Sequence, residues 1–235
     1  MWNDAQALSK LSGTLLGTSL FLLLLGALYY ALHLPQFALR VVQLETVPQH
    51  VDAKLVEAVV NSELSGNFFT MDMDRTRQAL EKLPWVRKAS MRRHFPWRLD
   101  VELEEHVALA HWNEDRLVNS YGEVFAAKTD QALPSFNGPE DKASAEVKLK
   151  FDGFTGMLAP IQDEIENISL SPRRAWQLHL KSGMVLKLGR EQTEQRLARF
   201  IEVYPYSMAT AGKPASYVDL RYRNGFAVNW PGGKV

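Results

Sequence analysis

The sequence predicts a membrane anchor that crosses the bilayer once, followed by an α+β part with two modules. Between Lys10 and Arg40 the chain carries no formal charge, and most of this stretch is apolar. A helix over Leu11–Leu34, at about 1.5 Å per residue, would be roughly 36 Å long, enough to cross a hydrocarbon core of about 30 Å. After this span, the sequence pattern first predicts a small module of helices and strands, and then a second module with several hairpins.

A cleaved secretory signal is the alternative interpretation of the apolar span. Such a signal has an apolar region of about 7–15 residues and ends at a small-residue cleavage site. Here the apolar run continues past Tyr29 and Tyr30, and no A-x-A site follows it. We therefore expect a retained anchor. Its orientation stays open, because Lys10 on one side and Arg40 on the other nearly balance in the positive-inside count.

The first module has the order β-α-α-β-β. Residues Leu39–Leu44 are typical of a short strand, and two helices are expected to begin at the N-cap residues Asp52 and Asp72. Two strands, Val86–His94 and Arg98–Trp112, follow. A pair of helices packed on one face of a small sheet satisfies this order.

From Asn113 onwards the pattern indicates a β-rich domain with a mixed or antiparallel sheet and covering helices. Hairpins are predicted within Leu117–Phe125, Ala175–Leu188 and Tyr217–Trp230, and helices around Val147–Leu158 and Glu191–Tyr204. In the last hairpin, strands over residues 217–223 and 226–230 flank Asn224-Gly225, the strongest short signal for a tight turn.

The composition and motifs exclude several classes of protein. Lys and Arg number 27, as do Asp and Glu, so the net charge provides no attraction for nucleic acid. The absence of cysteine rules out a disulfide scaffold, a thiolate zinc site and a cysteine nucleophile. The sequence has no G-x-S-x-G, H-E-x-x-H or glycine-rich phosphate loop. We therefore expect no catalytic site and no cofactor.

The nearest approach to a metal cluster is formed by Glu104, Glu105, His106 and His111. On a strand, the two histidines would lie on opposite faces, because they are five residues apart and the side-chain period is two. We therefore expect no metal site.

The last strand, Phe226–Trp230, is expected at a sheet edge. Unpaired backbone N–H and C=O groups at such an edge are a template for a partner strand. Tyr222 and Trp230 are residue types that dominate binding hot spots, and a charge at Val228 should abolish binding while the fold stays intact. The alternative is that Tyr222 and Trp230 only cap the core.

Short motifs along the whole chain resemble the FtsQ/DivIB family of bacterial cell-division proteins, in order and spacing. The first four are Asn67-Phe-Phe-Thr70, Leu83-Pro-Trp-Val86, Arg92-Arg93-x-x-Pro96-x-x-Leu99 and Glu105–Trp112. The remaining four are Arg173-Arg174-x-Trp176, Leu188-Gly189-Arg190, Arg196-Leu-Ala-Arg-Phe200 and Tyr217-Val-Asp-Leu-Arg-Tyr222.

This resemblance implies an arrangement of domains about the bacterial inner membrane. Residues 1–10 would be a cytoplasmic tail and residues 11–34 a transmembrane helix ending at Leu34. Residues 35–112 would form a POTRA domain, the polypeptide-transport-associated fold, and residues 113–235 a C-terminal β domain. Both domains would be periplasmic and located at the division septum.

The resemblance also implies a function and partners. A non-enzymatic scaffold would capture FtsB, in complex with FtsL, through the last hairpin. Tyr222, Gly225 and Trp230 fall in this hairpin, and Arg174 and Lys213 match basic positions of the same surface. Other division proteins, such as FtsK, FtsW and FtsI, would be met through the anchor and the POTRA domain. A membrane-anchored periplasmic cell-wall enzyme is the alternative function.

The chain departs from the family pattern at one position in the predicted domain junction. Family members often have proline where this chain has Ala108. Proline removes a ladder donor, whereas alanine can pair normally. The pairing of this stretch is therefore left open by the sequence.

Overall fold

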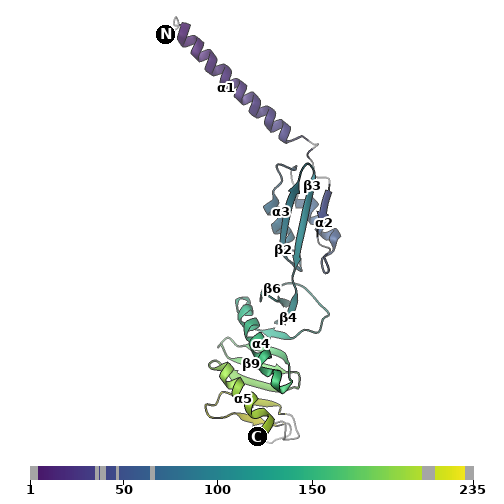
Figure 1. The fold of residues 1–235 in the computed structure, drawn as a ribbon, viewed down its shortest axis with the longest axis vertical. Helices are drawn as coiled ribbons and strands as arrows, with labels where there is room; N and C mark the ends of the chain where they lie inside the picture. The colour runs from purple at the N-terminus through teal and green to yellow at the C-terminus, as the bar shows by residue number, and fades with distance from the viewer. Residues whose placement is uncertain are drawn as a thin grey trace. The chain divides into compact units, whose positions relative to one another are not determined.

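The computed structural model describes residues 5–34, 37, 41–45, 48–63, 67–207 and 215–230, with only the backbone of residues 5–8. Residues 1–105 and 106–235 form two compact units. Figure 1 shows the helix α1, a small sheet accompanied by helices, and a larger sheet accompanied by further helices. Each unit is described separately below.

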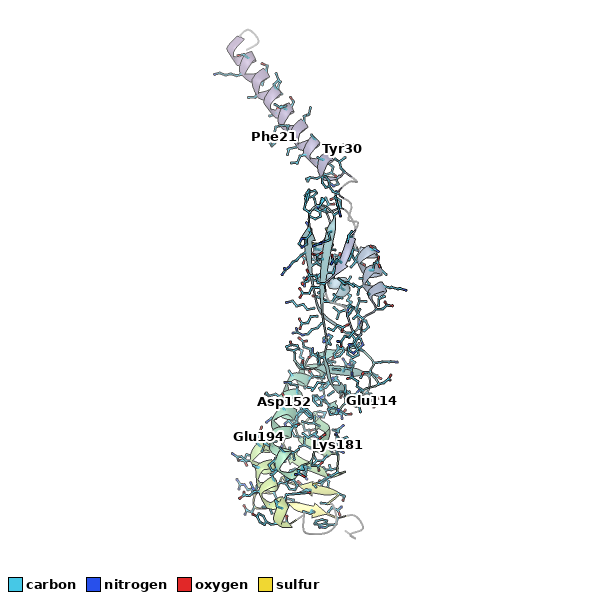
Figure 2. The ribbon with its side chains drawn as sticks, turned by 45° about the vertical axis from the view of Figure 1, so that its right-hand side comes forward. Phe21, Tyr30, Glu114, Asp152, Lys181 and Glu194 are labelled. Atoms are coloured by element: carbon cyan, nitrogen blue, oxygen red, sulfur yellow. The ribbon has the colours of Figure 1, made fainter. Side chains whose placement is uncertain are left out.

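Helix α1 covers Ala5–Leu32, and by length and composition its Ser9–Leu32 part can cross a membrane. Its described side chains are exposed on every side, including Phe21 and Tyr30, which point outward in Figure 2. A helix that is apolar all round fits a transmembrane anchor. It ends before the predicted Leu34, because proline at position 35 disfavours helical backbone in the residue before it.

The first unit contains a three-stranded sheet in the order β1-β3-β2. Strand β1 (Val41–Leu44) is parallel to β3 (Arg98–Glu105), and β2 (Val86–His94) is antiparallel to β3. Helices α2 (Ala53–Glu63) and α3 (Met73–Leu80) contact each other, and α3 contacts β2. The predicted β-α-α-β-β order is confirmed, although residues 39–40 of the first predicted strand lie outside the described residues.

Helices α2 and α3 both begin at the predicted N-caps. The Asp52 carboxylate accepts the backbone N–H of Lys54 at 2.9 Å, and Asp72 accepts that of Arg75 at 3.0 Å. Each bond satisfies an amide that has no partner within its helix. The helices then bury an apolar face against the sheet, in a core that includes Val56, Val60, Leu80, Leu99, Val101 and Leu103.

Glu105, the last residue of β3, fastens a loop to the sheet. Its carboxylate accepts the backbone N–H groups of Gln49, His50 and Val51, each at 3.0 Å. Burial raises the pKa of this carboxyl, but the hydrogen bonds from His50, Gln49 and Val51 outweigh it and hold the pKa below its usual value. The His50 ring also stacks on Trp85, with 4.2 Å between ring centroids.

Replacing Glu105 with glutamine should lower the free energy of unfolding by about 1–3 kcal/mol at pH 7, since hydrogen bonds to a charged group are lost. The folded-state pKa is lowered, so this stability is present above the unfolded pKa of about 4.3 and is lost as pH falls through the folded-state value. The free energies of unfolding of wild type and Glu105→Gln, measured by urea melts, should therefore converge at pH values below the folded-state pKa of Glu105. Glu57→Gln, at an exposed helix position, is the matched control and should change little.

The second unit contains a mixed nine-stranded sheet in the order β12-β11-β10-β9-β8-β7-β4-β5-β6. The β4/β7, β7/β8 and β10/β11 pairs are parallel, and the other five pairs in the described residues are antiparallel. The strands are β4 (Ala108–Trp112), β5 (Arg116–Asn119), β6 (Val124–Phe125), β7 (Ser135–Asn137), β8 (Ile165–Leu170), β9 (Trp176–Leu180), β10 (Val185–Gly189), β11 (Tyr217–Asp219) and β12 (Ala227–Asn229).

Two helices pack against this sheet. Helix α4 (Ser144–Leu158) contacts β7 and β8, α5 (Thr193–Ser207) contacts β10, and the helices touch each other. Short 3-10 helices, Asp141–Ala143 and Ala159–Ile161, flank α4. Along β9, Trp176, Leu178 and Leu180 are buried and alternate with partly exposed Gln177 and His179. This alternation places the core on the face that α4 and α5 cover.

The stretch predicted as one strand over Arg98–Trp112 is two strands in two different sheets. Strand β3 ends at Glu105, whereas β4 pairs with β5 and β7 of the second unit. The division between the units therefore falls between Glu105 and His106, before the predicted boundary at Trp112. Ala108 pairs with Asn119, and the register shifts between Ala108 and Ala110. In the sequence, Val107 and Leu109 continue the alternation of the preceding strand, but the buried residues of β4 are Ala110 and Trp112, so the sequence pattern did not reveal the break.

Two glycines of the second unit should respond oppositely to alanine. A Cβ at Gly138 would clash with the Trp112 ring, which is fully buried and donates its N–H to the Asp141 carboxylate at 3.0 Å. Gly138→Ala should therefore destabilise the protein by about 1–3 kcal/mol in thermal melts. Gly153, within α4, meets open space, so Gly153→Ala should stabilise it by about 0.5–1 kcal/mol. Equal effects at both positions would contradict this packing.

Candidate functional site

The candidate binding site is the hairpin that ends the nine-stranded sheet. Strands β11 and β12 are antiparallel, with Tyr217 opposite Asn229, Val218 opposite Val228 and Asp219 opposite Ala227. Among the described residues, β12 has no neighbour on its other side. One row of its backbone groups can therefore receive a further strand.

The turn of this hairpin is wider than the Asn224-Gly225 signal predicts. Because Asp219 pairs with Ala227, the loop spans residues 220–226 instead of two residues. The Asp219 carboxylate accepts two hydrogen bonds from Arg221, one from the backbone N–H at 3.1 Å and one from the side-chain Nε–H at 2.8 Å. This side-chain bond to a nearby amide turns the chain out of the ladder before the Asn-Gly pair is reached.

Asp219 and Arg221 form a two-point ion pair. The Arg221 Nη2 also lies 2.6 Å from the second oxygen of the Asp219 carboxylate, which is almost fully buried. The hydrogen bond from Arg221 holds the pKa of Asp219 below its usual value, and Asp219 raises the pKa of Arg221. Both groups therefore stay charged at neutral pH, and the start of the loop is held in one conformation.

The inward face of the hairpin belongs to the core. Phe226, Val228 and Trp230 recur at the strand period of two, and all three are partly buried against the core of the second unit. The Phe226 ring packs edge-on against Phe200, with 5.9 Å between centroids. Trp230, predicted chiefly as an interface residue, thus makes the core contact that was the alternative interpretation. Its role in binding stays a prediction.

Tyr222 and Gly225 lie in the loop between the two strands. The Tyr222 side chain is exposed, at 56% of its full surface. A Cβ built at Gly225 would meet no atom within 4 Å, so the loop is open on that side. These two predicted site residues therefore lie on the surface, next to the edge strand.

Arg174 lies at the same end of the sheet as this loop. It lies two residues before β9, and β9 is antiparallel to β10, which in turn is parallel to β11. Arg174 has a positive φ of 65° and its guanidinium is paired with Glu146 at the start of α4. The last predicted residue, Lys213, lies outside the described residues.

Three arginines at this end were not named as site residues from the sequence. Arg190, Arg196 and Arg221 line a shallow hollow of about 280 Å³, together with Glu191. Arg196 donates to the backbone oxygen of Leu188 at 2.6 Å. Arg190, Arg196 and Arg221 occur in the motifs that carry the resemblance, which was the signal available in the sequence. We call these three arginines and Arg174, which lines a different hollow at the same end of the sheet, the basic corner; within it Arg174 is paired with Glu146 and Arg221 with Asp219.

No group of three or more His, Asp or Glu residues that could hold a metal is found within the described ranges. His106 stacks on Phe125, with 4.1 Å between centroids, and is within 2.9 Å of the Asn119 amide.

The hairpin and the basic corner offer a backbone edge, an exposed aromatic ring and positive charge, which is the chemistry of protein recognition.

Comparison with known proteins identifies the family. The family model "Cell division protein FtsQ/DivIB, C-terminal" matches residues 110–221, and "POTRA domain, FtsQ-type" matches residues 37–106. A cell division protein FtsQ from Nitrosospira multiformis is 41% identical over 236 residues, which cover 97% of this chain and 98% of that protein. The chain belongs to the FtsQ/DivIB family.

Other FtsQ proteins agree with this assignment. One from Burkholderia pseudomallei is 40% identical over 239 residues, covering 99% of this chain and 95% of that protein. One from Escherichia coli is 38% identical over 173 residues, which cover 70% of this chain and 62% of that protein. The predicted family and fold class are confirmed. The chain is an FtsQ-type cell division protein with an N-terminal helix that fits a membrane anchor, a POTRA domain and an FtsQ-type C-terminal domain.

The two faces of β12 should differ sharply in their tolerance of charge. Val228→Asp should destabilise the second unit by about 1–3 kcal/mol, because Val228 packs against the core. Asn229→Asp, at the exposed neighbouring position, should change the stability by less than about 0.5 kcal/mol. Thermal melts followed by near-UV circular dichroism measure both. A charge at Val228 that left the melting temperature unchanged would contradict the observed packing.

Proposed function

We propose that this FtsQ-family chain is a non-enzymatic scaffold that binds FtsB, in complex with FtsL, by adding a partner strand to the outer edge of β12. The observation that carries this proposal is the place of β12 at the end of the sheet order. Main-chain hydrogen bonds of an added strand supply affinity, and neighbouring side chains supply specificity.

The surroundings of the edge strand favour a partner with an acidic segment and an apolar side chain. The basic corner lies at the end of the sheet where the loop 220–226 connects β11 to β12. Opposite charge steers the encounter and fixes the register of an added strand. The exposed Tyr222 is suited to contact an apolar side chain of the same partner.

The place of action is inferred from the anchor. We propose that α1 crosses the inner membrane, with residues 1–10 in the cytoplasm and both domains in the periplasm at the septum. Contacts with FtsK, FtsW and FtsI through the anchor and the POTRA domain are part of the same proposal. A cell-wall enzyme is the alternative, and an assay of the purified chain for hydrolysis of cell-wall glycan distinguishes the two.

Binding is tested with the full chain in lipid nanodiscs and a peptide from the periplasmic part of FtsB. Tyr222→Ala should weaken binding by about 2 kcal/mol, or roughly thirtyfold, in isothermal titration calorimetry. The matched control is Tyr121→Ala, since this tyrosine is similarly exposed and lies beside β6, at the opposite edge of the sheet. It should leave the affinity unchanged.

Hydrogen exchange locates the added strand in the same complex. Amides of Ala227–Asn229 should gain protection when the peptide binds, while those of Val124–Phe125, at the other edge, should not. Protection at β6, or at neither edge, would contradict strand addition at β12, even if the peptide bound with high affinity.

A further inference from the structure

Four phenylalanine rings of the first unit form an exposed aromatic cluster (Phe37, Phe68, Phe69 and Phe95). Ring centroids are 5.1 Å apart for Phe37 and Phe69, and 5.8 Å apart for Phe68 and Phe95. Phe68 is almost fully buried, whereas 70% of the surface of Phe95 and 40% of that of Phe69 are exposed. The cluster thus continues from the core of the unit out to its surface.

The exposed apolar surface extends onto the neighbouring turn and strand. Phe95 lies in the turn between β2 and β3, and Trp97, also in this turn, is partly exposed. The Val41 N–H donates to the Trp97 backbone oxygen at 3.4 Å, so the start of β1 lies beside the turn, and Val41 is exposed too. Several large apolar side chains that are exposed together mark a site of contact with something other than water.

Chain connectivity holds this cluster close to the end of the anchor. The Phe37 N–H donates to the backbone oxygen of Leu34 at 3.1 Å, and the Phe37 oxygen accepts the Phe68 N–H at 2.9 Å. Leu34 and Phe37 are three residues apart, a distance of at most about 11 Å along an extended chain. The headgroup layer beyond the hydrocarbon core is roughly 5–8 Å thick on each side. The cluster therefore lies within reach of that layer if α1 spans the membrane.

Residues beside the turn are compatible with a lipid surface. Asp100 is paired with Arg98 at 2.9 Å, so its negative charge is matched within the unit. Arg92, near the end of β2, is exposed and positively charged. Aromatic rings concentrate at membrane interfaces, and basic side chains are attracted to anionic headgroups.

We propose that the aromatic cluster and Trp97 are embedded in the interfacial layer of the bilayer that α1 crosses. This inference rests on α1 as the membrane span and is independent of any partner at β12. The membrane then contacts the protein at two places, the helix and the turn between β2 and β3. The contact fixes this end of the POTRA domain at the headgroups and restricts its rotation about the short connection after Leu34.

Because the chain has no cysteine, single cysteines can be introduced and labelled with an environment-sensitive nitrobenzoxadiazole dye. The full chain, with a label at Phe95→Cys, is placed in nanodiscs of phosphatidylethanolamine and phosphatidylglycerol. We expect a blue-shifted emission, quenching by lipids that carry a nitroxide on the acyl chain, and loss of quenching by aqueous iodide. The same result is expected in phosphatidylcholine discs if apolar insertion dominates, and a weaker one if headgroup charge contributes.

Three matched positions complete the test. Leu149→Cys has the same 70% exposure as Phe95 but lies on α4, and Lys88→Cys lies at the opposite end of β2; both labels should stay accessible to iodide. Leu22→Cys, within α1, should be quenched by nitroxide lipid and reports that the anchor is inserted.

If the label at position 22 is quenched by lipid but the label at position 95 behaves like that at position 149, the proposal is overturned while the anchor stands. The cluster would then be a surface for a protein partner. If the label at position 88 is quenched as strongly as that at position 95, the whole unit lies on the membrane, and a contact confined to the aromatic cluster is also overturned.

Discussion

The second unit is governed by the fact that its nine-stranded sheet is covered by helices on one face. Side chains alternate along every strand, so each strand must direct its apolar residues towards α4 and α5. In β12 and the residues that flank it, this constraint sends Phe226, Val228 and Trp230 inward and leaves Ala227 and Asn229 exposed. The hairpin is therefore a part of the core and a part of the surface at once. What it can offer a partner is its backbone edge and the loop beside it.

The first unit depends on a different kind of interaction. Its helices and sheet share a small apolar core, and the Glu105 carboxylate fixes the loop before α2 through three amide hydrogen bonds. Such a bond between residues distant in sequence leaves no trace in local patterns. The same residue is the last one of the unit. A single carboxylate thus stabilises the POTRA domain at the point where its chain leaves.

Much of the fold could be predicted from the sequence, because local chemistry determines it. The N-caps Asp52 and Asp72, the hairpin within Ala175–Leu188 and the helix around Glu191–Tyr204 all occur where the pattern indicates. Errors arose where one local interaction overrides another local signal, or where one sequence pattern continues across two different sheets. The predicted two-residue turn at Asn224-Gly225 does not form, because the Asp219–Arg221 pair turns the chain earlier. The alternation of apolar residues continues in the sequence from Glu105 to Ala108, and it concealed the change from one sheet to the other. The edge position of β12 was predictable from the sequence. The inward packing of Trp230 was not, because it depends on the pairing register of β12 with β11, which is set only in the assembled sheet.

The shortness of β12 has a consequence for how a complex would be built and dismantled. The strand is three residues long, so a partner that joins it gains few main-chain hydrogen bonds. A long, flat edge would also attract unrelated strands and aggregate, which a short edge avoids. Most of the discrimination must then come from the loop and the arginines beside it. A contact of this kind favours rapid exchange of the partner over a permanent complex. Rapid exchange suits a cell-division assembly that forms and disassembles in every cell cycle.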